Sequence, residues 1–420
     1  MNADVVAEKA RSMAPVMAAA TTAQKNTVLA TMIELLQSQA EQVVSANAQD
    51  IAESRAAGIP ETVVRRLGFG MEKLNSRVRS LRKIMALPDP VGRTIWEREL
   101  ENGLFAQRVR VPLGVILMIY EARPHVSVNA GAFCMKAGNA CILRGGSEAN
   151  HCNALLGRLW GQALKQAGLP REAIQMVSGS HEEIRELLQL EGQIDLVIPR
   201  GGKGLIAAVA EQSRIPVVKH YAGVCHLYVD KTADPDMAAR IAIDSKCLMP
   251  EVCNALETVL VCEEHPQGLK HVVDRLQGCG VEVRGCPETQ AACANVTPAT
   301  DEDWETEFLD LVVSVRVVKD CAAAVEHINT YGSHHTDSIV TADPMSAETF
   351  RRNVDSAVVL VNASTMFCDG ESLGMGAEIG ISTDKLHARG PMGLEELTSY
   401  KFVIRGEGQV MGDPDTFART

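Results

Sequence analysis

The residue best suited to covalent chemistry is Cys253, in the segment 246–257. Pro250 follows a predicted helix over 236–246, and an apolar strand comes after the cysteine. A cysteine at such a break can lie exposed near a helix end, where its thiolate is stabilised. No histidine lies within ten residues, so activation would have to come from a spatial neighbour or a helix dipole. Taken alone, this pattern is also compatible with a structural cysteine.

Two glycine-rich turns could bind phosphate groups. Each follows a strand-like run and carries basic residues: Arg144, Gly145, Gly146 and Ser147 in the first, and Arg200, Gly201, Gly202 and Lys203 in the second. Glycines let backbone amides approach phosphate oxygens, and the following helix adds partial positive charge. The alternative for either turn is an ordinary strand-to-helix loop. No Walker A sequence is present, which disfavours an ATP-dependent kinase.

Composition limits the class of protein. The chain has 420 residues, 46% hydrophobic and 22% charged, and its formal net charge is −12. A chain with this much negative charge is a poor candidate for general nucleic-acid binding, which needs a basic surface. Its twelve cysteines include no C-x-x-C pair, so no zinc ribbon is predicted, and a reduced, cytoplasmic protein is expected. An acidic leader and the lack of long apolar runs argue against a signal peptide and a membrane span.

The order of elements predicts an α/β fold. Residues 1 to about 87 have helical periodicity, and residues 103–112 alternate like an exposed or pairing strand. Strands then alternate with helices, which is typical of a doubly wound parallel sheet that binds ligands at the carboxyl ends of its strands. The predicted strands are 114–120, 140–143, 174–177, 194–198 and 216–219, then 258–261, 312–318, 338–341, 357–361 and a final one at 399–404.

Nine blocks of sequence, in order, resemble the gamma-glutamyl phosphate reductase family of the aldehyde dehydrogenase superfamily. The resemblance extends over nearly the whole chain, and the blocks that carry it are Tyr120–Pro124, Lys136–Ala140, Leu143–Gly146, Ile198–Gly204, Val218–Tyr221, Cys253–Thr258, Ala324–Ile339, Val361–Thr365 and Lys385–Glu395. The chain departs from many relatives at His125, Ala222 and Met366, where they carry Asn, Asp and Arg. Loss of the arginine at 366 removes an anion contact.

The resemblance implies a three-part layout. A Rossmann-type nucleotide-binding domain would comprise 1–100, 115–226 and 363–390, and an α/β catalytic domain would comprise 227–362. Strands in 101–114 and 391–410 would pair subunits into a homodimer or homotetramer, and 411–420 would be a mobile tail. The implied reaction is NADPH-dependent reduction of L-glutamyl 5-phosphate to L-glutamate 5-semialdehyde in proline biosynthesis, with a glutamate kinase as a further partner.

The resemblance also implies roles for single residues. Cys253 would be the nucleophile and would form a thioester. Glu307 would hold the nicotinamide ribose, and Arg144 would meet the 2′-phosphate of NADP. Arg123, Asn254 and Glu378 would bind substrate, and no metal is expected.

Two alternatives stay open. The first is another acyl-phosphate or acyl-thioester reductase of the same superfamily. The second is a non-catalytic, NADP-binding structural relative, against which the intact Cys253 segment argues.

Overall fold

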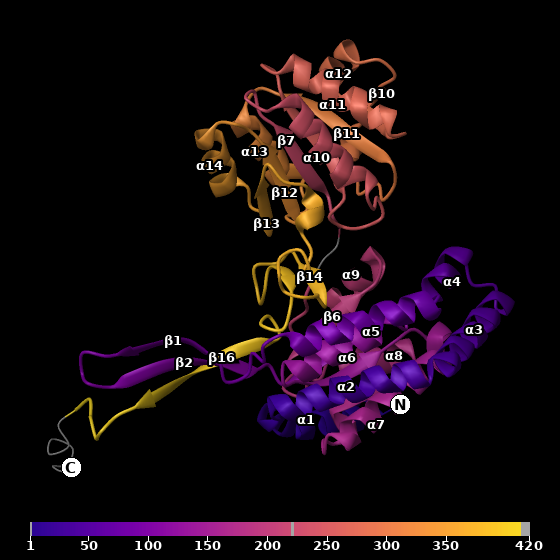
Figure 1. Cartoon of the computed structure of the whole chain (residues 1–420), viewed down its shortest axis with the longest axis vertical. Coiled ribbons are helices and arrows are strands. Elements are labelled where there is room, and N and C mark those ends of the chain that lie inside the picture. Colours follow the sequence, from indigo (N-terminus) through magenta and orange to yellow (C-terminus); the bar gives the residue numbers. More distant parts are fainter. Residues whose placement is uncertain (1, 220–221, 413–420) are drawn as a thin grey trace. The chain divides into compact units, whose positions relative to one another are not determined.

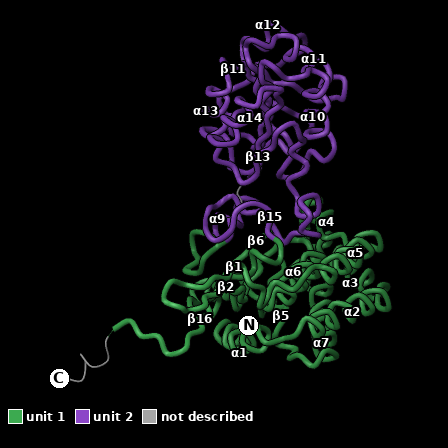
Figure 2. The backbone as a smooth tube through the Cα atoms, turned by 60° about the vertical axis from the view of Figure 1, so that its left-hand side comes forward, with its two compact units in different colours: residues 1–201, 209–217, 393–420 green, residues 202–208, 218–392 purple. Residues whose placement is uncertain are grey.

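The computed structural model describes residues 2–219 and 222–412, and the chain divides into two compact units (Figure 2). The first holds 1–201, 209–217 and 393–420, and the second holds 202–208 and 218–392. Residues 363–390, predicted to lie with the nucleotide-binding domain, therefore group with the catalytic segment instead. Residues 413–420 of the predicted tail lie outside the described residues.

A four-stranded parallel sheet is the centre of the first unit, in the order β5-β4-β3-β6. Its strands are β3 (Val115–Tyr120), β4 (Ala140–Arg144), β5 (Ile174–Val177) and β6 (Leu196–Arg200), all at predicted positions. Every residue of β3 and β4 is buried. Helices that cover both faces of a parallel sheet explain why these strands are apolar throughout rather than alternating.

Helices surround this sheet (Figure 1). They are α1 (Ala3–Ala19), α2 (Thr22–Ser38), α3 (Ala40–Ala56), α4 (Glu61–Leu67), α5 (Met71–Ala86), α6 (Val126–Lys136), α7 (Asn150–Gln166) and α8 (His181–Leu187). A capping box of Thr21 and Gln24 begins α2. The buried Lys25 ammonium pairs with Asp89 at 2.9 Å, which ties α2 to the segment after α5. Helix α9 (Lys203–Gln212) follows β6.

A three-stranded antiparallel sheet also belongs to the first unit, in the order β1-β2-β16 (Figure 1). Strands β2 (Phe105–Pro112) and β16 (Thr398–Arg405) confirm two predicted strands. Strand β1 (Thr94–Glu99) was not predicted, because its charged, mostly exposed residues lack an apolar face. Tyr400, Phe402 and Ile404 are exposed on one face of the edge strand β16.

The second unit contains a seven-stranded parallel sheet, in the order β10-β9-β11-β8-β7-β12-β13. The strands are β7 (Cys225–Val229), β8 (Leu256–Cys262), β9 (Glu282–Gly285), β10 (Thr297–Pro298), β11 (Val312–Val318), β12 (Thr336–Val340) and β13 (Val358–Val361). A short antiparallel pair, β14 (Gly380–Ser382) and β15 (Gly390–Met392), follows. The predicted strand over 216–219 is wrong: the described chain there forms only a single bridge between Val197 and Val217.

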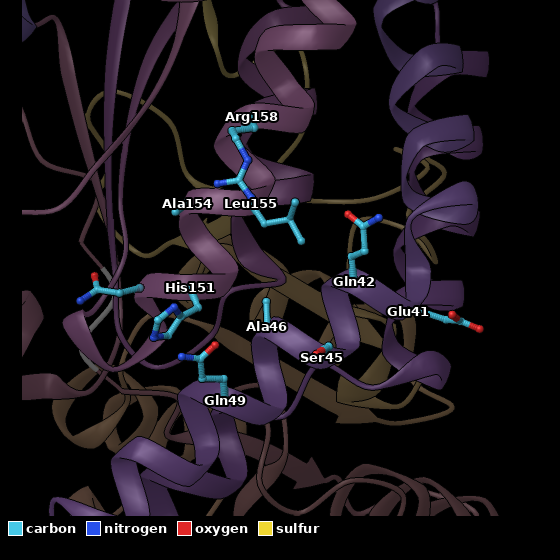
Figure 3. Close-up of a pocket in the computed structure, with 10 residues that line it drawn as sticks. Glu41, Gln42, Ser45, Ala46, Gln49, His151, Ala154, Leu155 and Arg158 are labelled. Carbon is cyan, nitrogen blue, oxygen red and sulfur yellow. The ribbon is translucent and has the colours of Figure 1, made fainter.

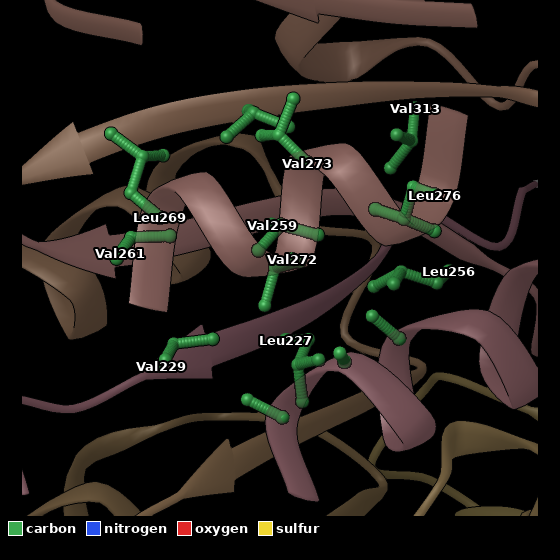
Figure 4. Packing of buried hydrophobic residues seen from close by; sticks show 14 of the residues in the cluster. Leu227, Val229, Leu256, Val259, Val261, Leu269, Val272, Val273, Leu276 and Val313 are labelled. Atoms are coloured by element: carbon green, nitrogen blue, oxygen red, sulfur yellow. The ribbon is translucent and has the colours of Figure 1, made fainter. Parts of the chain in front are cut away.

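Five helices pack on the larger sheet: α10 (Pro235–Cys247), α11 (Pro266–Gly278), α12 (Pro287–Ala292), α13 (Cys321–Tyr331) and α14 (Pro344–Asn353). The main core lies between strands β7, β8 and β11 and helices α10 and α11 (Figure 4). Leu227, Val259, Val272, Leu276 and Val313 are fully buried there. This core fixes the end of α10 and the start of β8, between which Cys253 lies. None of the described helices is both long and apolar enough to cross a membrane.

Candidate active site

Cys253 lies in the short loop between α10 and β8 and is half-buried. Helix α10 ends at Cys247, before Pro250, so the predicted helix break is confirmed. The Cys253 carbonyl accepts a hydrogen bond at 3.4 Å from the thiol of Cys225, the first residue of the neighbouring strand β7. Burial raises the pKa of Cys225 well above its ordinary value, so this neighbouring thiol stays protonated.

Gly223 packs directly against the backbone of Cys253. A Cβ at position 223 would lie 1.7 Å from the Cys253 carbonyl oxygen and 2.7 Å from its Cα. The Gly223 N–H donates to Glu307 Oε1 at 2.7 Å. Cys253 and Glu307, predicted as nucleophile and ribose ligand, therefore contact the same glycine. Only a residue without a side chain permits this approach.

A buried ion pair closes the base of the nucleophile loop. Lys246 Nζ, in the last turn of α10, lies 2.7 Å from Glu257 Oε2, near the start of β8, and both side chains are fully buried. Burial raises the pKa of Glu257 to about 7, although the Lys246 ammonium acts in the opposite direction. The pair joins the residues on either side of the loop, and a contact of this kind fixes how Cys253 is presented.

Asn254 connects the nucleophile loop to a second loop, 365–368. Its Nδ2 lies 3.3 Å from each of the carbonyl oxygens of Thr365, Met366 and Cys368. Its amide is thus used to hold this loop, and the substrate-binding role expected for Asn254 stays a prediction. Glu378 follows on the same connection and accepts from the Gly370 N–H at 2.9 Å.

The predicted phosphate turn at 144–147 lies at the carboxyl end of β4. The Arg144 side chain is buried, and its Nη2 donates to the Gly179 carbonyl at 3.3 Å. Its Nε is buried and has no hydrogen-bond partner among the described residues. A Cβ at Gly145 would lie 2.3 Å from the Asn153 amide, and one at Gly146 would meet the Glu148 carboxylate. A Cβ at Gly145 would also lie 2.9 Å from the buried Tyr120 ring, so packing favours glycine there, whereas the obstacle at Gly146 is the end of a flexible side chain.

The second predicted turn follows β6. Arg200 is the last residue of that strand, and its carbonyl accepts from the Glu121 N–H at 3.2 Å. A Cβ at Gly202 would meet no atom within 4 Å, and Lys203 begins α9. Arg123 lies in the turn after β3, the neighbour of β6. Arg123, Arg144 and Arg200 thus lie at one edge of the first unit's sheet, as parallel strands require.

The structure also contains a hollow that none of the predicted site residues lines. It has a volume of about 640 Å³ and lies between α3 and α7, where Figure 3 shows Gln42, Gln49, His151 and Arg158. Its neighbours His151 and Glu53 pair at 3.0 Å on the surface. Among the described residues, no group of three or more His, Cys, Asp or Glu side chains could hold a metal ion.

Sequence reasoning missed two features of the site. Gly223 precedes a strand that was not predicted, and its contact with Cys253 joins residues thirty positions apart, which no local pattern reveals. The Lys246–Glu257 pair could have been predicted in part, because a single acid within the apolar strand Leu256–Cys262 needs a buried partner of opposite charge.

Comparison with known proteins gives a consistent result. Residues 1–294 match the model of the aldehyde dehydrogenase family. A gamma-glutamyl phosphate reductase from Desulforapulum autotrophicum is 50% identical, over 96% of this chain and 97% of that protein. The crystal structure of a gamma-glutamyl phosphate reductase from Thermotoga maritima has a TM-score of 0.95 and 39% identity, and the match covers 98% of this chain and 100% of that one.

A more distant structure, an engineered glycolyl-CoA reductase with bound NADP+, shares the fold with a TM-score of 0.66 and 14% identity, over 96% of each chain. The α/β architecture predicted from the order of elements is confirmed by these structures. The chain belongs to the aldehyde dehydrogenase family and, within it, to the gamma-glutamyl phosphate reductases.

Proposed function

We propose that this chain reduces L-glutamyl 5-phosphate to L-glutamate 5-semialdehyde and phosphate with NADPH, as a step of proline biosynthesis. The observation that carries the proposal is the 50% identity, over 96% of the chain, with a relative named for this reaction. The position of Cys253 supports it, since this half-buried cysteine lies in a loop held by Gly223, Asn254 and the Lys246–Glu257 pair.

Cys253 would act as the nucleophile. Its sulfur attacks the acyl carbon, the carbon–oxygen bond to phosphate breaks, and a thioester with Cys253 remains. Phosphate is already a good leaving group, so the main demand on the protein is to position the substrate and to stabilise the oxyanion. The Cys253 N–H is a suitable donor for that oxyanion. After reduction, the thiohemiacetal collapses to the aldehyde and the thiol returns.

The residues present suit NADPH, which would supply the hydride when bound. The buried, unpartnered Arg144 Nε offers a donor for the 2′-phosphate of this cofactor, and arginine binds phosphate with paired hydrogen bonds. Glu307 already accepts from Gly223 through Oε1, so Oε2 would accept from a ribose hydroxyl. Gly145, Gly146, Ser147, Gly201, Gly202 and Lys203 would line the remainder of the cofactor site.

Hydrolysis of the thioester needs a general base, and the two acids next to the nucleophile loop are already engaged in other contacts. Glu257 is fully buried and paired with Lys246, and Glu307 is bonded to Gly223. The segment Val218–His226, where hydrolytic aldehyde dehydrogenases place a glutamate base, contains no carboxylate in its sequence. General-base help to water is worth about 10²–10⁴-fold, so its lack protects the thioester.

The test is an assay of NADP+ reduction with L-glutamate 5-semialdehyde and phosphate. We expect turnover in wild type, and loss of at least about 100-fold in Cys253→Ala, because removal of a nucleophile costs several orders of magnitude. Cys247→Ala, in the same segment but on α10, is the matched control and should retain activity. If aspartate semialdehyde, or propionaldehyde with coenzyme A, is preferred instead, the substrate assignment is wrong.

A further inference from the structure

Four basic side chains gather around His125 at the edge of the first unit's sheet, where Glu121 acts on one of them, Arg123. Lys73 and Arg77 come from α5, Arg123 from the turn after β3, and Arg200 from the end of β6. Among the described residues, none of the four makes a salt bridge. They surround His125, whose ring lies 5.9 Å from that of Phe69. We call these four side chains together with His125 the cationic cluster.

The cluster contains buried nitrogen atoms that lack partners. Arg77 Nε and His125 Nδ1 are both inaccessible to solvent and make no hydrogen bond within the described chain. Among the described residues, the Arg77 side chain makes one hydrogen bond, from Nη2 to the Ser76 hydroxyl at 3.2 Å. An arginine Nε–H is always a donor, and leaving it buried and unpaired costs about 1–3 kcal/mol. The buried Arg77 Nε–H therefore indicates a missing acceptor.

The charges in the cluster act on one another. Burial, then Arg77, Lys73, Arg123 and Arg200, lower the pKa of His125 to about 3, so its imidazole stays neutral. Burial, then Arg200 and Arg66, lower the pKa of Arg123, while Glu121 only partly compensates. Such a concentration of positive charge is unfavourable by itself, and it occurs in a chain with a net charge of −12. A bound anion would remove the repulsion.

The backbone of the cluster is strained at the residue before Arg123. Ala122 is buried with φ at 31°, a left-handed region that costs a non-glycine residue about 1–3 kcal/mol. Its N–H donates to Glu148 Oε1 at 2.7 Å, which holds the turn in place. Strain of this kind is typical of ligand sites, where the surrounding structure fixes a required side-chain direction.

We propose that the cationic cluster binds a phosphate dianion: the phosphoryl group of the acyl phosphate substrate, and inorganic phosphate as its product. The identity of the phosphate rests on the proposed function. Each of the three arginines can bind phosphate with paired hydrogen bonds, and four cations match a dianion better than a single carboxylate. This assigns Arg200 to the substrate's phosphate, in place of its expected role at the cofactor, and adds Lys73 and Arg77, which the sequence did not indicate.

The experiment measures the binding of inorganic phosphate and, separately, of NADP+ by calorimetry, and the KM of L-glutamate 5-semialdehyde in a steady-state assay. The variants are Arg77→Gln, Arg77→Lys and Lys73→Gln, with Arg82→Gln as the control, because Arg82 is exposed on the same helix. We expect Arg77→Gln to raise the Kd for phosphate about 10–100-fold, as loss of a charge-assisted hydrogen bond implies. Lys73→Gln and Arg77→Lys should have smaller effects. Arg82→Gln, and the NADP+ Kd in every variant, should stay within about twofold of wild type.

Three results would overturn the proposal: an unchanged phosphate Kd in Arg77→Gln, a loss of NADP+ affinity in its place, or a change confined to the KM of the semialdehyde. The second would assign the cluster to the cofactor's phosphates, and the third to the substrate α-carboxylate. Because Lys73 is exposed, Lys73→Gln keeps the test valid if Arg77 variants fail to fold. Binding is measured without turnover, so an inactive wild type that binds phosphate through these residues would refute the reaction and support the site.

Discussion

Replacing Gly223 by alanine should damage catalysis through a single methyl group. That methyl would lie 1.7 Å from the Cys253 carbonyl oxygen, whereas a Cβ essentially never lies within 3.0 Å of a non-bonded heavy atom beyond its own residue and its chain neighbours. The two segments must therefore separate by at least about 1.3 Å. Gly223 does not have a left-handed φ, so the backbone itself tolerates alanine and the effect is steric.

A displacement of about 1 Å at a reacting group can cost about 100-fold in rate, which is about 2.7 kcal/mol of activation free energy. We expect kcat to fall by at least that factor in Gly223→Ala, with overpacking lowering the free energy of unfolding by about 1–3 kcal/mol. The assays are steady-state turnover and the rate at which iodoacetamide alkylates Cys253. NADP+ affinity should fall less than kcat, because the Arg144 contacts are untouched and only the Gly223–Glu307 hydrogen bond is disturbed.

Gly278→Ala is the matched control for this experiment. Gly278 ends α11 in the same unit, and a Cβ there would meet no atom within 4 Å. It should leave kcat and alkylation unchanged. A folded Gly223→Ala protein with kcat within about threefold of wild type would refute the claim that this contact positions the nucleophile.

Three further predictions concern other parts of the chain. Arg144→Ala should lower the ratio of kcat/KM for NADP to kcat/KM for NAD at least about tenfold. An unchanged ratio would mean that Arg144 does not bind the 2′-phosphate and would make Lys203 the next candidate. The pKa of Glu257 is raised to about 7 in the folded chain, so between its ordinary pKa and about pH 7 the folded chain holds a proton that the unfolded chain has lost. The free energy of unfolding contributed by this group should therefore fall as the pH rises through that range. Urea midpoints measured against pH should show this fall in wild type and lack it in Glu257→Gln. Phe402→Asp, on the face of β16 that exposes Tyr400, Phe402 and Ile404, should convert the expected homodimer or homotetramer to monomers in sedimentation velocity. Lys401→Ala, on the opposite face, should not. A wild-type protein that is already a monomer would contradict this prediction.

Much of the fold could be predicted from the sequence. The strands β3, β4, β5 and β11 are short apolar runs next to glycines or helices, and such runs form the buried strands of parallel sheets. Strand β1 could not be found this way, since its residues are charged and it is held by pairing with β2 rather than by burial. The position of 363–390 depends on contacts with residues far along the chain, which no local pattern carries.

The candidate site was only partly predictable for the same reason. A helix break followed by a strand marked Cys253, and two glycine turns after strands marked Arg144 and Arg200. Lys73 and Arg77 lie on an amphipathic helix, where periodicity shows which face is apolar but not which turn lies beside it. Their relation to Arg123 appears only once α5 and the end of β3 are packed together.

The most direct test of the central claim is the time course of NADPH formation from L-glutamate 5-semialdehyde and NADP+, with and without phosphate. If the Cys253 thioester forms and lacks a base to hydrolyse it, turnover should be sustained with phosphate. Without phosphate it should stop after a burst of about one equivalent per site, and Cys253→Ala should give no burst. Sustained turnover at a comparable rate in phosphate-free buffer, or a burst in Cys253→Ala, would contradict the account.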